Sequence, residues 1–355
     1  MNPALLESGM KIAVIALGGN AILRKGQEAS PEVQLANIRE AISSIEGALA
    51  VYDAFALTHG NGPQVGNDLI RSYTGAEFEN LPELDLVDCV ANTQGRIGHW
   101  LVHEMKRNAV FAERNIACVL THVYVNKDTF KGDEYTKYVG PWRRNDPETR
   151  ARLDGRGIIY KSPAGSEDSI RRVVPSPSPY AIEEIEIIDS LLQRGVITIC
   201  CGGGGIPVYN PSYKANLDGS AKGGEKFRRS EVVIDKDRAS SILAISLYER
   251  NPTIEVHLII LADCKGLYKT AELRDEDFIS DMSFEELRGF LEETRLDPGS
   301  IGPKVEAIHD FLAVGGRDAY LGPLEDFPLI FDPASRIGTH FHRTQQLDMF
   351  GKKGE

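Results

Sequence analysis

Three lysines stand among carboxylates and glycines in a pattern that suits phosphate chemistry. Lys236 lies between Asp235 and Asp237 directly after an apolar Val-Val-Ile run, Lys137 precedes Tyr-Val-Gly-Pro, and Lys304 follows Gly-Ser-Ile-Gly-Pro. A phosphoryl group in transfer spreads negative charge over its oxygens, so positioned ammonium groups supply much of what catalysis needs. A lone lysine is usually a solvated surface charge. An Asp-Lys-Asp triplet at the end of a buried strand instead favours a role in a site, because the carboxylates would hold the lysine protonated and oriented.

Glycine turns close three of the apolar runs. Gly18 and Gly19 follow the first run, Gly60 and Gly62 follow the second, and four consecutive glycines, 202–205, follow a later one. Tight turns alone would explain any one of these. Three together predict a phosphate site, because glycine lets backbone N–H groups approach an anion at the carboxyl ends of strands. Neither the Walker A string nor the Gly-x-Gly-x-x-Gly string occurs, so the site is of another type.

The elements that position these residues alternate along the chain. Apolar runs predict strands from residue 11 to 17 and at 54–58, 117–122, 196–201 and 256–262. Helices are predicted from Ser30-Pro31 onward, over 182–194, and after Ser283, where Glu286 completes a capping box. This alternation predicts an α/β fold with a mostly parallel central sheet covered by helices on both faces. The polar segment 126–172 predicts an inserted lobe or lid, and 209–230 a loop.

Composition narrows the class of protein. The 355 residues carry a formal net charge of −12, which argues against nucleic acid or an anionic membrane as the main partner. With 42% hydrophobic and 26% charged residues the chain is typical of a folded soluble protein. The five cysteines form no Cys-x-x-Cys pair. There is neither a signal-peptide pattern at the start nor an apolar run long enough to span a membrane, so we expect a cytoplasmic protein.

Taken together, these residues resemble the carbamate kinases of the amino acid kinase family. The matching strings occur in the family's order and cover about residues 11 to 338. They are Ala-Leu-Gly-Gly-Asn-Ala (16–21), His-Gly-Asn-Gly-Pro-Gln-Val-Gly (59–66), Thr-Gln-Gly (93–95), Val-Val-Pro-Ser-Pro (173–177), Cys-Gly-Gly-Gly-Gly-Ile-Pro-Val (201–208), Val-Ile-Asp-Lys-Asp (233–237) and Gly-Ser-Ile-Gly-Pro-Lys (299–304). Within the wider family, the octapeptide is particular to carbamate kinases.

The resemblance implies the amino acid kinase fold, with two lobes and a protruding subdomain. The N-terminal lobe, 11–208, would bind the phosphoryl acceptor and would carry the protruding subdomain at about 126–172. The C-terminal lobe, 209–343, would bind the nucleotide, and 344–355 would form a polar tail. The family also implies a homodimer.

The reaction that the resemblance implies is ATP + carbamate ⇌ ADP + carbamoyl phosphate, often run toward ATP in arginine metabolism, with Mg²⁺ accompanying the nucleotide. Carried over by motif, the catalytic residues would be Lys137, Lys236, Asp237 and Lys304. The phosphoryl group and acceptor would be cradled by Gly18, Gly19, Asn20, Gly60, Asn61, Gly62, Gly203 and Gly204. Nucleotide contacts would come from Asp235, Asp263, Gly266, Tyr268 and Gly302. No residue is assigned as a metal ligand.

Several segments depart from the family pattern. A basic, glycine-rich string before Val173 is replaced by Glu-Asp-Ser-Ile-Arg (167–171), Ser178 stands where the family has a basic residue, and Leu-Ala-Asp-Cys-Lys (261–265) replaces Leu-Thr-x-Val-Asp. The loop 209–230 is longer and more basic than in the family. Two alternatives therefore stay open: a kinase of another small carboxylate or phosphonate, and a non-catalytic nucleotide-binding homologue.

Overall fold

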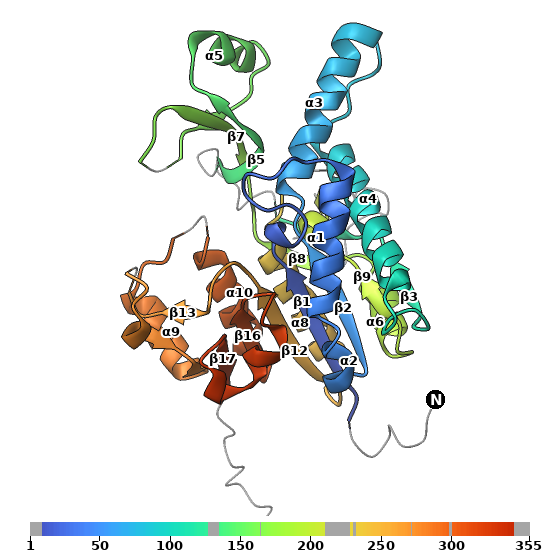
Figure 1. Ribbon diagram of the computed structural model, residues 1–355, viewed down its shortest axis with the longest axis vertical. Helices are drawn as coiled ribbons and strands as arrows, with labels where there is room; N and C mark the ends of the chain where they lie inside the picture. The colour runs from blue at the N-terminus through green and yellow to red at the C-terminus, as the bar shows by residue number, and fades with distance from the viewer. Residues whose placement is uncertain are drawn as a thin grey trace, which may run out of the picture.

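The computed structural model describes residues 9–126, 135–163, 165–209, 228–229, 232–270, 272–297 and 300–343. Its main sheet contains β1 (Lys11–Leu17), β2 (Ala54–His59), β3 (Ile116–Cys118), β9 (Ile197–Ile199), β12 (Glu255–Leu261), β15 (Asp281–Ser283), β16 (Asp318–Gly322) and β17 (Thr339–His342). The strand order is β15-β17-β16-β12-β1-β2-β9-β3 (Figure 1). Neighbouring strands are parallel apart from β16 and β17. The predicted α/β class with a mostly parallel sheet is confirmed.

Helices cover both faces of this sheet (Figure 1). The helices that the structure describes are α1 (Pro31–Ser44), α2 (Ala48–Val51), α3 (Gly62–Glu79), α4 (Leu86–Arg107), α5 (Pro147–Asp154), α6 (Ile185–Leu192), α8 (Lys236–Arg250), α9 (Phe284–Glu293) and α10 (Gly302–Ala313), of which α5 lies away from this sheet. Short 3-10 helices are Gly19–Ala21, Gly202–Gly204, Asp275–Asp277, Phe327–Phe331 and Pro333–Ser335. The predicted helix start at Ser30 and the capping box of Ser283 with Glu286 are both present. No helix of the described residues is long and apolar enough to cross a bilayer.

Alternating side chains of β1 divide the core into two layers. Ile12 and Val14 pack in a cluster with buried side chains of α6, α8 and α10. Ala13 and Ile15 point the other way and pack with α1 and α4. Because successive residues of a strand face opposite sides of the sheet, a strand that is buried on both faces reads as one continuous apolar run. This burial explains the uninterrupted Ile-Ala-Val-Ile-Ala-Leu sequence.

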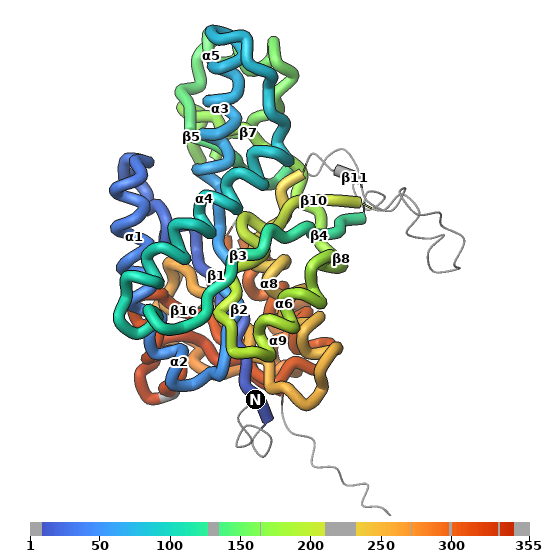
Figure 2. Tube along the Cα trace, turned by 90° about the vertical axis from the view of Figure 1, so that its right-hand side faces the viewer, coloured from blue at the N-terminus to red at the C-terminus, as the bar shows by residue number. Residues whose placement is uncertain are grey.

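A protruding subdomain stands beside α3 at one end of the molecule (Figures 1 and 2). Its sheet has the order β5-β7-β6, with β5 (Tyr135–Arg144), β6 (Tyr160–Lys161) and β7 (Ser169–Pro175), and α5 lies between β5 and β6 in the chain. It overlaps the segment 126–172, for which the sequence predicts an inserted lobe. A third sheet, of order β11-β10-β4-β8, contains β4 (His122–Val125), β8 (Pro179–Ile182), β10 (Ile206–Tyr209) and β11 (Arg228–Arg229). β13 (Leu267–Tyr268) and β14 (Phe278–Ile279) form a hairpin-like pair.

Some predicted boundaries are wrong. The strand predicted over 117–122 is two strands in different sheets, since β3 ends at Cys118 and β4 begins at His122. Between them, the side chain of Gln94 accepts a hydrogen bond from the Thr121 backbone N–H at 2.5 Å, and thereby replaces a strand partner. The helix predicted over 182–194 is confined to α6. Most of the predicted loop 209–230, and all of the tail 344–355, lie outside the described residues.

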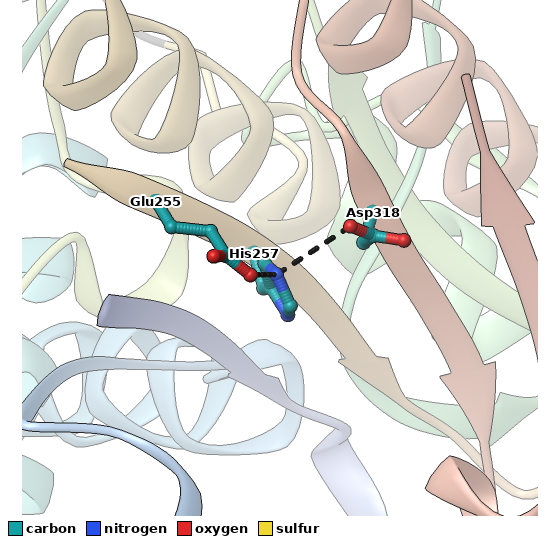
Figure 3. Close-up of side chains that lie close together, drawn as sticks. All are labelled: Glu255, His257 and Asp318. Carbon is teal, nitrogen blue, oxygen red and sulfur yellow. Dashed lines mark hydrogen bonds and ion pairs between the residues drawn. The ribbon is translucent and has the colours of Figure 1, made fainter. Parts of the chain in front are cut away.

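Histidines and carboxylates line the amino ends of β12 and β16, at the edge opposite the glycine turns (Figure 3). His257 lies with Nε2 at 2.7 Å from Glu255 and 3.6 Å from Asp318, while its Nδ1 is 3.0 Å from the Tyr52 hydroxyl. The three side chains could in principle supply metal ligands. However, Lys11 already pairs with Glu255 at 3.0 Å, and the imidazole has hydrogen-bond partners at both nitrogens. The arrangement is a satisfied structural network.

His340, which contacts Asp318 of this network, predicts that stability falls as pH rises above about 6.5. Burial disfavours the charged form of His340, but hydrogen bonds and charges of Asp318 (2.8 Å) and Asp281 (2.9 Å) outweigh it and raise the His340 pKa. Because the folded-state pKa is the higher one, the stabilisation is complete below the unfolded value, about 6.5, and is lost as pH rises through the folded value. Urea unfolding across this range should show the loss. His340→Gln should flatten it, and an unchanged slope in that variant would contradict the assignment.

Candidate active site

The glycine turns after β1 and β2 meet the end of β12 at one edge of the sheet. A Cβ built on Gly60 would lie 3.5 Å from the Cα of Gly19 and 3.6 Å from Cδ of Lys236. One built on Gly18 would lie 3.0 Å from the carbonyl oxygen of Leu261. The chain order of the strands reverses between β1 and β12. In open α/β sheets ligands bind outside the carboxyl ends of strands at such a reversal.

A cavity of about 670 Å³ opens at this edge. Eight of the residues predicted from the sequence line it: Gly18, Gly19, Asn20, Lys236, Asp263, Gly266, Tyr268 and Lys304. A neighbouring cavity of about 520 Å³ shares three of them and adds Arg24 and Glu325 to the lining. Residues far apart in the sequence are therefore gathered around one space of the size of a small-molecule site.

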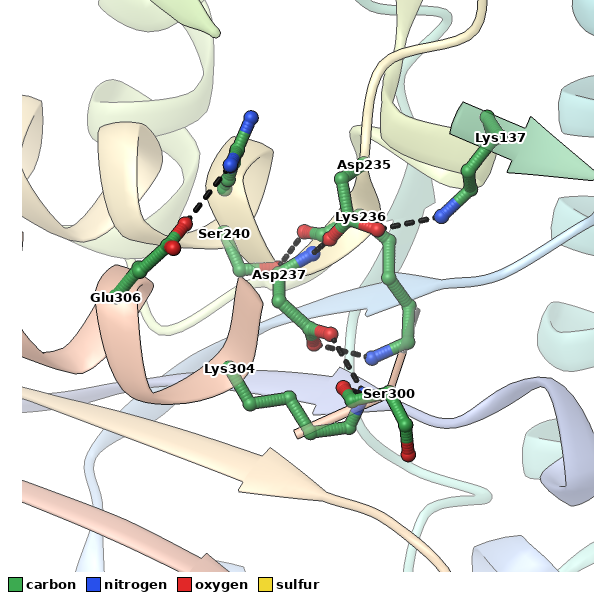
Figure 4. Close-up of polar contacts among 9 residues, drawn as sticks. Lys137, Asp235, Lys236, Asp237, Ser240, Ser300, Lys304 and Glu306 are labelled. Carbon is green, nitrogen blue, oxygen red and sulfur yellow. Dashed lines mark hydrogen bonds and ion pairs between the residues drawn. The ribbon is translucent and has the colours of Figure 1, made fainter. Parts of the chain in front are cut away.

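Two carboxylates position the three lysines (Figure 4). Asp235 caps the N-terminus of α8, where its Oδ1 accepts the Asp237 backbone N–H at 2.9 Å, and its other oxygen pairs with Lys137. Asp237 pairs with Lys236 through Oδ1 and with Lys304 through Oδ2, the latter at 3.1 Å. Lys137 comes from the protruding subdomain and Lys304 from the first turn of α10. The cluster thus joins the subdomain to the main body.

The charges of this cluster are largely removed from water. Lys236 is only 9% exposed, and burial lowers the pKa of its ammonium group although Asp237 favours the charged form. Burial also opposes ionisation of Asp235, but Lys137 outweighs it and holds the pKa of this carboxyl well below its usual range. Burial opposes the charge of Lys304 as well, yet Asp237 raises its pKa. An added anion, such as a phosphate, would compensate the desolvated ammonium groups.

The four-glycine turn after β9 serves close packing behind the site. Gly203 and Gly204 are buried and have φ of +67° and +92°. A Cβ on Gly203 would lie 2.2 Å from the amide nitrogen of Asn61, and one on Gly204 would lie 2.2 Å from the carbonyl oxygen of Ile234. These contacts require glycine whether or not a ligand is bound. The predicted contact of both residues with a phosphoryl group stays a prediction.

Gly203→Ala is expected to destabilise the protein by about 2 kcal/mol or more, from backbone strain and the clash with Asn61. Gly26→Ala is a matched control, because Gly26 also has positive φ, +85°, but faces open space. Urea unfolding of the two variants separates the clash from the strain. Equal losses of unfolding free energy would contradict the packing role.

The remaining predicted residues lie near the cavity without lining it. Asn61 caps α3 in a buried position and donates to Thr93 Oγ1 at 2.8 Å. Gly62 is the first residue of α3. Gly302 is the first residue of α10, and its N–H is already bound to the Asp297 carbonyl at 2.9 Å. Gly302 therefore has a structural role at the start of α10, and its predicted contact with the nucleotide stays a prediction.

Arg171 lies beside the candidate site, although the sequence analysis does not include it among the predicted site residues. It ends the segment 167–171, which is less basic than the corresponding string of the family. Its Nη2 nevertheless lies 4.0 Å from the position that a Cβ on Gly62 would take. Its Nε is buried and finds no hydrogen-bond partner among the described residues, and burial lowers the pKa of the guanidinium. The guanidinium carbon of Arg171 lies over the ring of Trp142, 5.5 Å from the ring centroid. A poorly compensated cation beside the turn of β2 is suited to an anionic acceptor, and only the folding of β7 toward α3 reveals its position.

Asp263 is the acidic side chain that lines both cavities, and it is a candidate ligand for a divalent cation. Asp235 and Asp237 are bound to lysines, whereas Asp263 lines both cavities, and the described part of the chain provides no hydrogen bond or ion pair to it. Burial and the nearby Glu325 raise the Asp263 pKa. A divalent ion bound mainly by phosphate oxygens and water, with one protein carboxylate, fits this donor set.

Fold and site define the chain as an α/β protein with a lysine-lined cavity at the carboxyl edge of a mostly parallel sheet. It is 37% identical over 320 residues to the carbamate kinase of Pyrococcus furiosus, covering 89% of this chain and 94% of that protein. It is 35% identical over 324 residues to the carbamate kinase of Lentilactobacillus hilgardii, covering 90% and 93%. The chain belongs to the carbamate kinase family.

Solved structures agree with this assignment. The carbamate kinase from Giardia lamblia bound to AMP-PNP superimposes with a TM-score of 0.74 and 28% identity, covering 95% of this chain and all of that chain. The same enzyme bound to citric acid gives a TM-score of 0.78. No family model matches the chain. The amino acid kinase fold implied by the sequence strings is therefore the fold of this protein.

Proposed function

We propose that this protein catalyses reversible phosphoryl transfer between ATP and carbamate, giving ADP and carbamoyl phosphate, and that it serves ATP formation from carbamoyl phosphate. The observation that carries the proposal is the cluster of three lysines on two carboxylates beside the glycine turns. A protein that only binds a nucleotide has no need of ammonium groups arranged around a group in transfer. The family's activity and this geometry point to the same chemistry.

In this proposal the chain works by positioning and charge compensation. An oxygen of carbamate attacks the γ-phosphorus, the bond from that phosphorus to the β-phosphate oxygen breaks, and ADP leaves. Because carbamate is already an anion, no protein base is required. Lys236 and Lys304 compensate the phosphate oxygens, and Lys137 approaches from the acceptor side. The turns at Gly18 and Gly60 allow backbone N–H groups to come near the transferred group.

We infer that the metal accompanying the nucleotide is Mg²⁺. Asp263 would hold it, directly or through water, and the ion would supply charge neutralisation between phosphate oxygens. Asp263 would thereby help to orient the nucleotide phosphates toward the lysines. Gly266 and Tyr268 line the same cavity and are proposed nucleotide contacts.

The division of labour between parts of the chain is also a proposal. Residues 11–208 would bind the acceptor, with the protruding subdomain supplying Lys137, and residues 209–343 would bind the nucleotide. The eight-stranded sheet joins both parts through the pairing of β1 with β12, so the site forms between lobes that share one sheet. A homodimer in the cytoplasm is proposed on the family resemblance.

The test is ATP formation from carbamoyl phosphate and Mg·ADP, followed by coupling to NADPH production. We expect rapid formation of ATP. In the opposite direction, with ATP as the phosphoryl donor, we expect faster turnover with carbamate than with a panel of other small carboxylates and phosphonates. Absence of ATP formation would refute the proposal. Preference for another acid would identify that acid as the acceptor, and nucleotide binding without any turnover would indicate a non-catalytic homologue.

A further inference from the structure

A second cavity, of about 110 Å³, lies between α3 and the protruding subdomain, away from the lysine cluster. α3 and β5 run side by side in both views (Figures 1 and 2). Its apolar wall comes from both units: Leu69 and Ile70 belong to α3, Val139 to β5 and Leu153 to α5. It shares no lining residue with the large cavity at the glycine turns. It is therefore a separate space, enclosed partly by apolar side chains.

The polar part of this cavity is strongly cationic. Its lining includes Arg143, Arg152, Arg156 and Arg172, and Glu77 is the single carboxylate among the lining residues that the structure describes. The chain as a whole has a net charge of −12. Four arginines around one small space in an acidic protein are a local reversal of charge, and such reversals mark sites for anions.

Two of the arginines are already held by neighbours. Arg172 donates to the Tyr73 hydroxyl at 2.9 Å. Arg156 lies over the ring of Tyr73 at 4.4 Å and pairs with Glu83 at 3.0 Å. Tyr73 thus fixes two guanidinium groups at the cavity wall, so this part of the site is ordered without a ligand.

The other two arginines, Arg143 and Arg152, are not held by an ion pair with any described residue. In the described part of the chain, the side chains of Arg143 and Arg152 make no ion pair and no hydrogen bond to a carboxylate. Arg143 is partly buried and Arg152 is exposed, and burial together with the charge of Arg152 lowers the pKa of Arg143, so the two guanidinium groups repel each other. An anion placed between them would offset this repulsion and accept charge-assisted hydrogen bonds from both side chains.

We propose that this cavity binds a small organic anion, a carboxylate or phosphate with an apolar or aromatic body, at a site separate from phosphoryl transfer. The anionic group contacts Arg143 and Arg152, and the apolar body packs on Leu69 and Val139. Val139 is two residues after Lys137 on β5. A ligand here joins β5 to α3 and acts on the strand that carries Lys137, so the site has the position of an effector site.

Calorimetric titration of the protein saturated with Mg·AMP-PNP tests the proposal with two probes. Phenyl phosphate represents the phosphate class and phthalate the carboxylate class, while inorganic phosphate measures the contribution of charge without an apolar body. We expect saturable binding of at least one organic probe, tighter than inorganic phosphate. Arg143→Gln and Arg152→Gln should each weaken it about tenfold, the loss of one charge-assisted hydrogen bond.

Arg144→Gln is the matched control. Arg144 is the neighbour of Arg143 on β5, is exposed and does not line the cavity, so binding should be unchanged in that variant. Lys236→Ala should also leave it unchanged, because Lys236 lines only the other cavity. The proposal is overturned if neither probe binds, if Arg143→Gln and Arg144→Gln bind equally well, or if Lys236→Ala abolishes binding. Thermal unfolding of each variant establishes that the altered proteins are folded.

Discussion

Lys236→Ala should lower turnover by about 10² to 10³-fold while the protein remains folded. Lys236 contributes a buried ammonium group at the first residue of α8, beside the turns of β1 and β2. Removing it takes away one charge that compensates the phosphate oxygens more strongly in the transition state than in the bound substrate. Asp237 keeps Lys304 as a partner at 3.1 Å, so no buried carboxylate is left without a cation. The expected loss is therefore in kcat.

Arg238→Ala provides the matched control on the same helix. Arg238 lies two residues further along, pairs with Glu306 at 2.8 Å and is partly exposed, and exposed ion pairs of this kind contribute little. Its steady-state rate of ATP formation should be close to that of the unchanged protein. A Lys236→Ala protein that is folded and retains turnover within about threefold of the original would show that Lys236 takes no part in the chemical step.

The central fold could be predicted because its sequence signals are local. An apolar run buried on both faces, a glycine turn, and a capped helix beginning at Ser30 each depend on neighbouring residues alone. The boundary between β3 and β4 could not be predicted in this way. It depends on the side chain of Gln94 in α4, which accepts a hydrogen bond from the backbone N–H of Thr121. No local sequence pattern predicts a hydrogen bond between residues so far apart in the chain.

The candidate site likewise contains residues that local sequence patterns predict and residues whose position depends on distant contacts. Lysines next to carboxylates and glycines are visible in the sequence, and the structure brings Lys137, Lys236 and Lys304 together around two aspartates. The position of Arg171 beside the site could not be predicted from the sequence, because it depends on how the protruding subdomain packs against α3. The four-glycine turn misleads in the opposite direction, since its packing against Asn61 already demands glycine. A run of glycines indicates that another group comes close to the backbone, but it does not show whether that group is a ligand or another part of the protein.

Two glycines lie in close contact where the protruding subdomain packs against α3. Gly66, in the first half of α3, and Gly140, on β5, approach so closely that a Cβ on Gly66 would lie 1.7 Å from the Cα of Gly140 and 2.2 Å from its nitrogen. Both obstructing atoms belong to the backbone, so no side-chain rotation relieves the clash. Gly140 is three residues after Lys137. The separation of the two backbones therefore sets where Lys137 lies relative to Asp235.

Gly66→Ala is expected to reduce turnover by about 10²-fold, because the added methyl group pushes β5 away from α3 and displaces Lys137 by roughly 1 Å or more. Gly75→Ala on the same helix is the control. There a Cβ meets only the Leu81 side chain at 3.4 Å, so removal of a helical glycine should leave activity unchanged and stabilise the protein slightly.

A double-mutant cycle identifies the route of this effect. If Gly66→Ala acts by displacing Lys137, then combining it with Lys137→Ala should lower the rate of ATP formation little further than Lys137→Ala alone. Fully multiplicative losses would mean that the clash disturbs the site by another path, such as the start of α3 at Gly62. Non-additive losses would instead establish that the contact between Gly66 and Gly140 exists to position a lysine supplied by the protruding subdomain.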